Sequence, residues 1–522
     1  MSAALAEAVA IEPGRTRYGM VFDMDACVGC QTCTIACKQT NQTTPGILWR
    51  NVLDLEVGKF PAVERSFLLT GCQHCDEPPC VPVCPTGATW KRDDGLVVID
   101  YDTCIGCSSC VVSCPYQART LDKDPPTYYG GAPMPTERTA QQGERDGVAQ
   151  KCTFCKDRID DGLARGLVPG VDPDATPACA NACISQAITF GNLADPADRA
   201  ARLLADAGGR QMHAELGTNP HIFYIGERRE NISTPGPVQR SWDIRAAMNF
   251  IAGGAAAGLM LAAFFAWALA GLPTAWLAGV NLGAGALMAF GLFCVFLKLG
   301  RKARFWRVLT RWQTSWMTRE TYCVALIYAA MAAMLARPHA VALVALAIGA
   351  AGFLVSQAKI LHTARGIPAW RSPRVPPLLV LTALFEGAGL LFLVLTALPA
   401  PGMGGRMAAA VAAVAGLMLA IIWPRFVAEV EPDTKGELNI GARRVSLVGQ
   451  WLAAAVFAVY ALVPGSQLVA AAAAIAGLAA VAQGAFWKYR LIVVAAHFQG
   501  LRIPARAGHA HRRSPAVAAA QL

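Results

Sequence analysis

Sixteen of the eighteen cysteines in this chain fall into four groups of four, all before residue 184. Two groups have the spacing C-x2-C-x2-C-x3-C, the ligand pattern of bacterial-type [4Fe–4S] ferredoxins. The second group lengthens its middle gap to four residues, and the fourth opens that gap into a loop of 23 residues. In chain order, the groups are Cys27, Cys30, Cys33, Cys37; Cys72, Cys75, Cys80, Cys84; Cys104, Cys107, Cys110, Cys114; and Cys152, Cys155, Cys179, Cys183.

The spacing also predicts how these ligands are shared between clusters. Three cysteines of a tight loop bind one cubane, and the fourth, carried away by the following turn, binds the other cluster of a pair. Groups two and three are close in sequence and should form one two-cluster module, which leaves groups one and four for the second. The four predicted ligand sets are Cys72, Cys75, Cys80 with Cys114; Cys104, Cys107, Cys110 with Cys84; Cys27, Cys30, Cys33 with Cys183; and Cys152, Cys155, Cys179 with Cys37.

Two other cysteine chemistries fit this pattern less well. Eight disulfides are typical of small secreted domains, but no signal peptide precedes these cysteines, and C-x2-C-x2-C is too tight for pairwise bridges. Zinc sites prefer two C-x2-C pairs separated by a longer gap. We therefore expect four [4Fe–4S] clusters. The remaining two cysteines, Cys294 and Cys323, lie in apolar stretches and are interpreted as small core residues.

The second half of the chain has a different composition. From residue 246 to about 487 it consists mostly of Ala, Leu, Val and Gly in long uncharged runs. Runs of about 20 apolar residues are typical of transmembrane helices. Eight are predicted, over residues 246–272, 276–299, 320–336, 340–361, 377–399, 407–424, 445–464 and 468–487.

The expected fold is an α+β ferredoxin-like four-cluster domain followed by an all-α eight-helix transmembrane bundle. The predicted boundaries are 1–193 for the [4Fe–4S] domain with its two modules, 194–245 for a linker with a small helix and a hinge at 234–237, 246–487 for the membrane anchor, and 488–522 for a basic tail. Short β segments such as Gly95–Asp100 should separate the cysteine groups. The Gly- and Pro-rich residues 160–177 should form a solvated loop or contact a partner subunit.

Charge predicts the orientation in the membrane. The net charge is +10, and its placement is uneven: 21 Lys and Arg residues near the predicted helix ends lie on the side shared with both termini, whereas the opposite side has only Arg337 and Arg406. By the positive-inside rule, the basic side faces the cytoplasm. Met1–Gly19 contains no apolar segment of a signal peptide, which agrees with this orientation. We expect an inner-membrane protein whose iron–sulfur domain and termini are cytoplasmic, and whose charge serves the lipid bilayer rather than nucleic acid.

Several motifs resemble those of a known family. Residues 27–33 (CVGCQTC), 71–75 (GCQHC), 78–88 (PPCVPVCPTGA) and 104–116 (CIGCSSCVVSCPY) resemble the four-cluster subunit of dimethyl sulfoxide reductase-type molybdoenzymes. The resemblance covers about residues 17–192 and implies a catalytic partner subunit that holds molybdenum on a molybdopterin cofactor. In some relatives, such as nitrate reductases, one cysteine of the third group is replaced, but here all are present. Ile184 departs from the family, which usually has Pro after the last cysteine.

The membrane half resembles the quinone-reactive anchor subunit of the same enzymes. Residues 315–320 (SWMTRE) resemble its Ser-Trp-x-x-Arg-Glu motif. Such anchors often carry His-Leu-Gly before the basic loop, where this chain has Lys298-Leu299-Gly300. The resemblance implies that the chain is a natural fusion of two subunits and that quinone or quinol is its membrane substrate.

Ionisable groups at membrane depth are the candidates for quinone and proton chemistry. Glu386 lies well inside the fifth predicted helix, and Glu320, Arg319 and Lys298 lie at cytoplasmic helix ends. Simpler explanations are snorkelling for Lys298 and interfacial anchoring for Arg319. We expect no haem, because paired histidines facing each other inside helices are absent from the sequence of the predicted helices.

The leading hypothesis is a non-catalytic electron-transfer and quinone-reactive subunit. A cytoplasmic catalytic side resembles sulfite- or phenylacetyl-CoA-oxidising members of the family, which send electrons to quinone. The alternative is a component of a menaquinol-oxidising reductase for dimethyl sulfoxide or another S- or N-oxide. A membrane-tethered ferredoxin-type carrier is disfavoured, because a tether needs one helix rather than eight.

Overall fold

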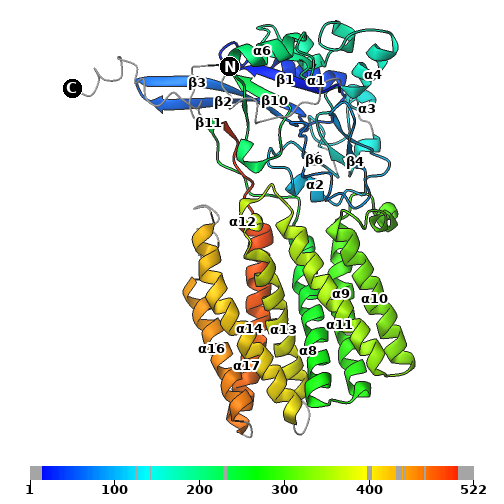
Figure 1. The fold of residues 1–522 in the computed structure, drawn as a ribbon, viewed down its shortest axis with the longest axis vertical. Helices are drawn as coiled ribbons and strands as arrows, with labels where there is room; N and C mark the ends of the chain where they lie inside the picture. The colour runs from blue at the N-terminus through cyan, green and yellow to red at the C-terminus, as the bar shows by residue number, and fades with distance from the viewer. Residues whose placement is uncertain are drawn as a thin grey trace, which may run out of the picture.

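The chain folds into a mixed α/β domain that sits on the end of a bundle of long helices (Figure 1). This computed structural model describes residues 15–123, 126–140, 143–226, 232–396, 402–430, 438, 443–463 and 466–503. Four of the basic residues near the predicted helix ends, which were counted for the orientation, lie outside the described residues: Arg228, Arg229, Lys435 and Arg506.

A four-stranded sheet with the order β8-β1-β10-β9 forms one end of the α/β domain. Its central strand β1, Tyr18–Asp23, has almost no exposed residue, which is typical of a strand covered on both faces. It pairs antiparallel with β8 (Ile188–Asn192) and parallel with β10 (Ile222–Ile225), and β10 pairs with β9 (Arg210–Gln211). The predicted linker 194–245 is therefore corrected: with α6 (Arg199–Ala207), its residues up to Ile225 belong to the cluster domain.

The rest of the domain consists of three two-stranded antiparallel sheets and short helices around the cysteine loops. The predicted β segment at 95–100 is confirmed as β5. The solvated loop expected over 160–177 is only partly observed, because a helix and a 3-10 turn occupy its two ends. The strand pairs are β2 (Arg50–Lys59) with β3 (Ala62–Gly71), β4 (Thr89–Lys91) with β5 (Val97–Ile99), and β6 (Thr120–Leu121) with β7 (Ala149–Gln150); the helices are α1 (Thr32–Thr40), α2 (Ser109–Val112), α3 (Pro135–Ala140), α4 (Lys156–Ala164) and α5 (Ala178–Asn181).

Seven helices among the described residues are long and apolar enough to cross a membrane. They correspond to the predicted spans one to six and eight. The predicted seventh span lies in α16 (Arg443–Leu462). Its apolar part, Gly449–Leu462, is shorter than the seven candidate spans. The seven spans are Ile244–Ala270 (α7, a π-helical turn and α8), Thr274–Lys298 (α9), Trp316–Ala336 (α10), Ala340–His362 (α11), Val375–Thr396 (α13), Gly402–Glu429 (α14) and Gln467–Val494 (α17 and a second π-helical turn).

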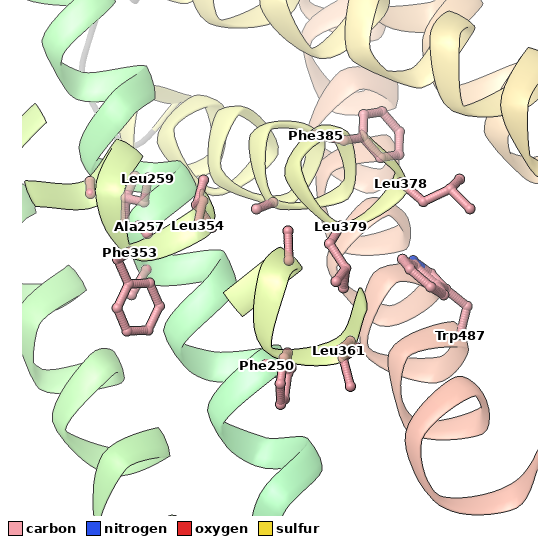
Figure 2. Packing of buried hydrophobic residues seen from close by; sticks show 14 of the residues in the cluster. Phe250, Ala257, Leu259, Phe353, Leu354, Leu361, Leu378, Leu379, Phe385 and Trp487 are labelled. Carbon is pink, nitrogen blue, oxygen red and sulfur yellow. The ribbon is translucent and has the colours of Figure 1, made fainter. Parts of the chain in front are cut away.

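The helices pack around a shared apolar core, which Figure 2 shows where α8, α11, α13 and α17 meet. Phe250, Phe353 and Leu379 are among its buried side chains. Small residues let α8 and α13 approach closely: a Cβ on Gly258 would lie 1.8 Å from the Ala383 carbonyl oxygen. Such small-residue contacts are typical of helix packing in membranes, where apolar surface alone gives little drive for association.

The chain crosses between the two parts twice, before the first span and after the last. Strand β11 (Ile232–Ser233) pairs with β12 (Arg502–Ile503), and the backbone amide of Gln239 donates to the Ala496 carbonyl. The predicted hinge at 234–237 is thus held by the returning chain rather than free. The predicted tail 488–522 is described to residue 503, and that part is structured as the end of the last span and a strand.

Candidate functional site

The second and third cysteine groups interleave in the half of the domain nearest the helices. Burial raises the pKa of the Cys75 thiol, and Cys72, Cys80 and Cys114 lie close enough to raise it further. On the neighbouring site, Cys84 lies close to Cys107 and Cys110, whose pKa values are raised first by burial. Cys114 therefore lies beside cysteines of the second group, and Cys84 lies beside two of the third.

The first and fourth groups are interleaved in the same way. Burial and then Cys183 raise the pKa of the Cys27 thiol, and a small cavity is lined by Cys27, Cys30, Cys33 and Cys183. Cys37 lies instead beside the fourth group. The Asn41 side-chain amide spans the two groups, with its Nδ2 3.5 Å from the Cys37 Sγ and 3.7 Å from the Cys155 Sγ.

The thiol environment fits iron–sulfur clusters. Burial raises the pKa of both Cys104 and Cys114 to about 12, so these thiols keep their protons unless iron replaces them. No three His, Cys, Asp or Glu side chains in the described part of the chain converge on a single-ion position. A lone zinc ion needs such convergence, since its sulfur ligands lie about 2.3 Å from the metal. A cubane, whose irons sit at separate corners, does not.

Two buried arginines supply a second test of that fit. Arg50 is fully buried, and its Nη2 lies 3.7 Å from the Cys152 Sγ. Arg119, 3% exposed, donates from Nη2 to the Cys80 Sγ over 3.1 Å. None of the ion pairs between described residues involves either guanidinium. A buried cation without a carboxylate partner is costly, and negatively charged clusters with thiolate ligands would supply the missing charge.

Local backbone geometry builds these loops. Each of the helices α1, α2 and α4 is directly preceded by a non-glycine residue in the left-handed conformation. These residues are Gln31, Ser108 and Cys155, with φ of 61°, 66° and 56°. This conformation is strained for such residues and persists where the surroundings enforce it, often at functional sites. Gln31 and Ser108 directly follow the second cysteine of their groups, and Cys155 is the second cysteine of its own group, so the left-handed residue lies inside each cysteine loop.

The cysteine groups form a path from the far end of the domain to the membrane helices. The helices α1 and α4, next to the first and fourth groups, lie at the distal end, whereas α2, in the third group, lies directly above the bundle (Figure 1). Cys30 of the first group is exposed. The third group meets the bundle, where the Gly300 amide donates to the Gly106 carbonyl over 3.3 Å. A Cβ on Gly300 would lie 1.8 Å from the Gly147 carbonyl oxygen, so glycine is needed for this contact.

A cavity of about 390 Å³ lies at this junction, and we refer to it as the interface pocket. Its wall contains Cys107 from the cluster domain together with Trp242, Lys298, Glu320 and Asn249 from the membrane part. The Lys298 Nζ and the Trp242 Nε1 donate to the Cys107 carbonyl oxygen over 2.9 Å and 3.3 Å. The Lys298 ammonium also lies 5.3 Å from the centre of the Trp242 ring, within cation–π range.

The predicted ionisable candidates fall in three different places. Glu320 and Lys298 share the interface pocket, and the Glu320 Oε1 accepts from the Asn249 Nδ2 over 2.9 Å. Arg319 lies outside it, donating to the carbonyls of Trp312 and Gln313 in the basic loop. This contact suits an interfacial anchor.

Glu386 lies deeper in the bundle, and its carboxylate pairs with Lys488. The two atoms are 2.6 Å apart, and both side chains are 1% exposed. Sequence reasoning placed Lys488 in the basic tail, so this partner was missed. The two ends of α11 carry histidines: His339 caps its start by accepting from the Ala342 amide, and His362 at its end lines a second cavity of about 630 Å³.

Sequence reasoning missed several residues of the interface pocket. Trp242 lies just before the first apolar run and Asn249 near its start, and no spacing marks either residue as functional. Lys298 was predicted as a candidate for quinone and proton chemistry, and it lies in the pocket wall. The run Lys298-Leu299-Gly300, noted for its likeness to the family's His-Leu-Gly, did not by itself predict the contact with the cluster domain, although a glycine directly after a membrane helix permits such a close approach.

Comparison with known proteins places the cluster domain among molybdoenzyme subunits. A family model for a 4Fe–4S dicluster domain matches residues 63–128. A protein of Halobacterium salinarum that is named as the iron–sulfur component of a dimethyl sulfoxide reductase is 39% identical over 40% of this chain and 79% of its own length. A subunit of the selenate reductase of Mesobacillus selenatarsenatis is 37% identical over 40% and 70%, and a subunit of the sulfite dehydrogenase of Allochromatium vinosum is 36% identical over 41% and 85%. These matches lie in the amino-terminal part, before the membrane helices.

Proposed function

Because the chain belongs to the family of iron–sulfur subunits that includes those of dimethyl sulfoxide and selenate reductases, we propose that it carries electrons between a molybdopterin catalytic subunit and membrane quinone. The observation that supports this proposal most strongly is that Cys107, Lys298 and Glu320 line one pocket. A cluster ligand, a cation and a carboxyl group would then surround a bound quinone where the cluster domain meets the membrane.

In this proposal, the chain holds four [4Fe–4S] clusters, which accept and pass on one electron at a time. The interleaved cysteine groups support the ligand sets expected from the spacing. Cys30 belongs to the most exposed set, which makes that end the docking point of the catalytic subunit. Exposed apolar side chains surround it, with Val28 at 58%, Ile35 at 60% and Ile184 at 70% exposure. Such exposed apolar groups favour a protein partner.

The interface pocket suits quinone better than the neighbouring cavity. Its walls are mainly aliphatic and aromatic, including Phe250, Leu292 and Phe296, whereas the cavity of about 630 Å³ has Asp76, Glu77 and Lys91 in its wall. Ligand pockets of this kind are mostly apolar with a few placed polar groups. Lys298 would donate to one quinone oxygen, and Glu320 would exchange a proton with the other. A quinone ring in this cavity of about 390 Å³ would lie beside the cluster loop, because Cys107 is in its wall.

We further propose eight spans, with α16 as the seventh crossing. The pairing of β11 with β12 supports an even number, because it holds both ends of the bundle on the side of the cluster domain. The basic loop after α9 lies on the same side, since Arg304 donates to the Tyr101 carbonyl over 2.7 Å. By the positive-inside rule, this side is the cytoplasm of a cell whose inner membrane holds the protein.

A cytoplasmic catalytic subunit favours electron flow from its substrate to quinone, as in the sulfite- or phenylacetyl-CoA-oxidising enzymes that the sequence resembles. Similarity to a component of a sulfite dehydrogenase supports this direction. The alternative is menaquinol oxidation for dimethyl sulfoxide or another S- or N-oxide, and similarity to a component of a dimethyl sulfoxide reductase favours it. In either case Glu386, which lies deeper in the bundle, takes part in proton transfer and does not contact the quinone.

The proposal is tested by binding a redox-inactive quinone analogue, such as an alkyl hydroxyquinoline N-oxide, to the reduced full chain in lipid nanodiscs. The electron paramagnetic resonance signal of one cluster should change on binding, because Cys107 lies in the pocket wall. A Leu292→Trp variant, which fills the pocket, should abolish the change. Absence of any effect in the wild-type chain would remove the pocket as the quinone site.

A further inference from the structure

The Glu386–Lys488 pair joins two membrane helices, α13 and α17. Its two side chains are 1% exposed, and the Lys488 Nζ lies 2.6 Å from the Glu386 Oε2. Replacing a buried ion pair by apolar residues is often neutral or stabilising, so packing does not account for it. Charged groups at such depth usually serve ion or proton paths.

A file of polar groups leads from this pair to the interface pocket. Gly254 on α8 lies between the pair and Gln357 on α11: a Cβ built on it would be 3.0 Å from the Lys488 Nζ and 3.6 Å from the Gln357 Oε1. The Gln357 Nε2 donates to the Asn249 carbonyl over 2.9 Å. The Asn249 Nδ2 then donates to Glu320 over 2.9 Å, and Glu320 lines the pocket.

Two acceptor atoms along this file have unused hydrogen-bonding capacity. The Glu386 Oε1 and the Asn249 Oδ1 are buried without a hydrogen-bond partner among the described residues. A buried oxygen left in this state costs free energy, which a bound water or an added proton removes. The absence of a side chain at Gly254 keeps space open beside both Lys488 and Gln357.

The backbone is unusual at both ends of the file. Asn249–Gly253 is a π-helical turn within the first span, and Arg490–Val494 is another that follows Lys488 after one residue. Such turns are rare and occur often at functional sites, where they leave backbone groups displaced from the regular ladder. Two of them flank the same polar file.

We propose that these groups form a proton relay between the Glu386–Lys488 pair and Glu320. Reduction of a quinone to a quinol takes two electrons, which arrive from the clusters, and two protons. Each proton that Glu320 gives to a quinone oxygen is replaced from the pair through water held by Gln357 and Asn249, and the pair takes up a proton from water. The relay runs in reverse for quinol oxidation. This inference rests on the proposed quinone function and assigns the source of its protons.

The test uses Gly254→Ala, which places a methyl group in the file without removing a titratable group. Lys488 Nζ, the closest atom, ends a flexible side chain and can shift. The matched control is Gly279→Ala on α9, where an added Cβ meets no atom within 4 Å. The full chain is loaded with clusters in nanodiscs, reduced, freed of reductant and mixed with a short-tailed ubiquinone. Visible absorption follows cluster oxidation, and a pH dye follows proton uptake.

Gly254→Ala should slow both cluster oxidation and proton uptake at least about tenfold, somewhat less than the usual size of general acid–base effects. Its cluster resonance spectra and the control variant should match the wild type. The double variant Glu386→Met/Lys488→Met, which keeps the core filled and neutral, should be equally slow. Wild-type rates in both variants would overturn the relay while leaving the quinone function intact. A wild-type chain that quinone does not oxidise would overturn the quinone function itself.

Discussion

The side chain of Lys298, the last residue of α9, donates to the carbonyl oxygen of Cys107 over 2.9 Å. A membrane helix therefore ends directly on a cysteine loop, without an intervening linker. The contact is reinforced by Lys123, which donates to the Lys298 carbonyl, and by the close approach of Gly300 to Gly147. Because electron transfer requires short distances between cofactors, a rigid junction at this place is what the proposed function needs.

Removing this ammonium should affect the nearest cluster. In Lys298→Met, loss of a nearby positive charge disfavours the reduced cluster, so its reduction potential should fall by tens of millivolts, where about 59 mV is tenfold for one electron. Redox titration followed by paramagnetic resonance measures this shift. Lys302→Met, an exposed change in the following basic loop, serves as control. Equal potentials in both variants would show that the Lys298 charge does not act on a cluster.

Glu320 should matter for quinone turnover and not for the clusters. Glu320→Gln keeps the shape of the side chain and its contact with Asn249 but cannot exchange a proton. Turnover with quinone should therefore fall by about a hundredfold, the size of typical acid–base effects, while the cluster spectra stay unchanged. Glu429→Gln, beside Arg374 at a helix end, is the matched control. Unchanged turnover would remove Glu320 from the mechanism.

The crossed ligand sets can be tested with two serine substitutions. Cys84 belongs to the second group by sequence but is proposed to bind the cluster of Cys107. In Cys84→Ser, the paramagnetic signal that responds to a quinone analogue should be altered or lost. In Cys114→Ser that signal should persist, while another cluster changes. The opposite outcome would mean that each cysteine group binds its own cluster.

The buried arginines should set cluster potentials. The pKa of Arg119 is raised by thiols of two cysteine groups, including Cys80 and Cys110, although burial alone would lower it. Arg119→Gln should lower the potentials of the two clusters in that module by tens of millivolts, where about 59 mV is tenfold for one electron. Arg50→Gln should do the same in the other module, because Arg50 lies by Cys152 and Cys179. Potentials that change in the wrong module would contradict the assignment.

Local patterns predicted much of this protein. Cysteine spacing constrains loop geometry so tightly that the grouping of thiols could be expected from the sequence. Apolar runs likewise located the helices to within a few residues, because a membrane demands continuous apolar length. The motif that ends at Glu320 also marked a residue that lies in the interface pocket.

What the sequence did not reveal depends on contacts between distant segments. Strand β10 is only four residues long, and its pairing with β1 has no local signal, so residues up to Ile225 were assigned to a linker. Lys488 resembled one more basic residue at a helix end, since only folding brings it to Glu386. Trp242 lies outside the apolar runs, and its position over Lys298 follows from the docking of the two parts.

The central claim is that electrons pass between the clusters and quinone through the interface pocket. The most direct measurement is the oxidation of the reduced full chain by a short-tailed ubiquinone in nanodiscs, compared with Leu292→Trp. We predict rapid oxidation of the wild-type clusters and its loss in the variant, while a water-soluble oxidant still oxidises both through the exposed Cys30 end. Equal oxidation of the two chains by quinone, or none of either, would contradict the account.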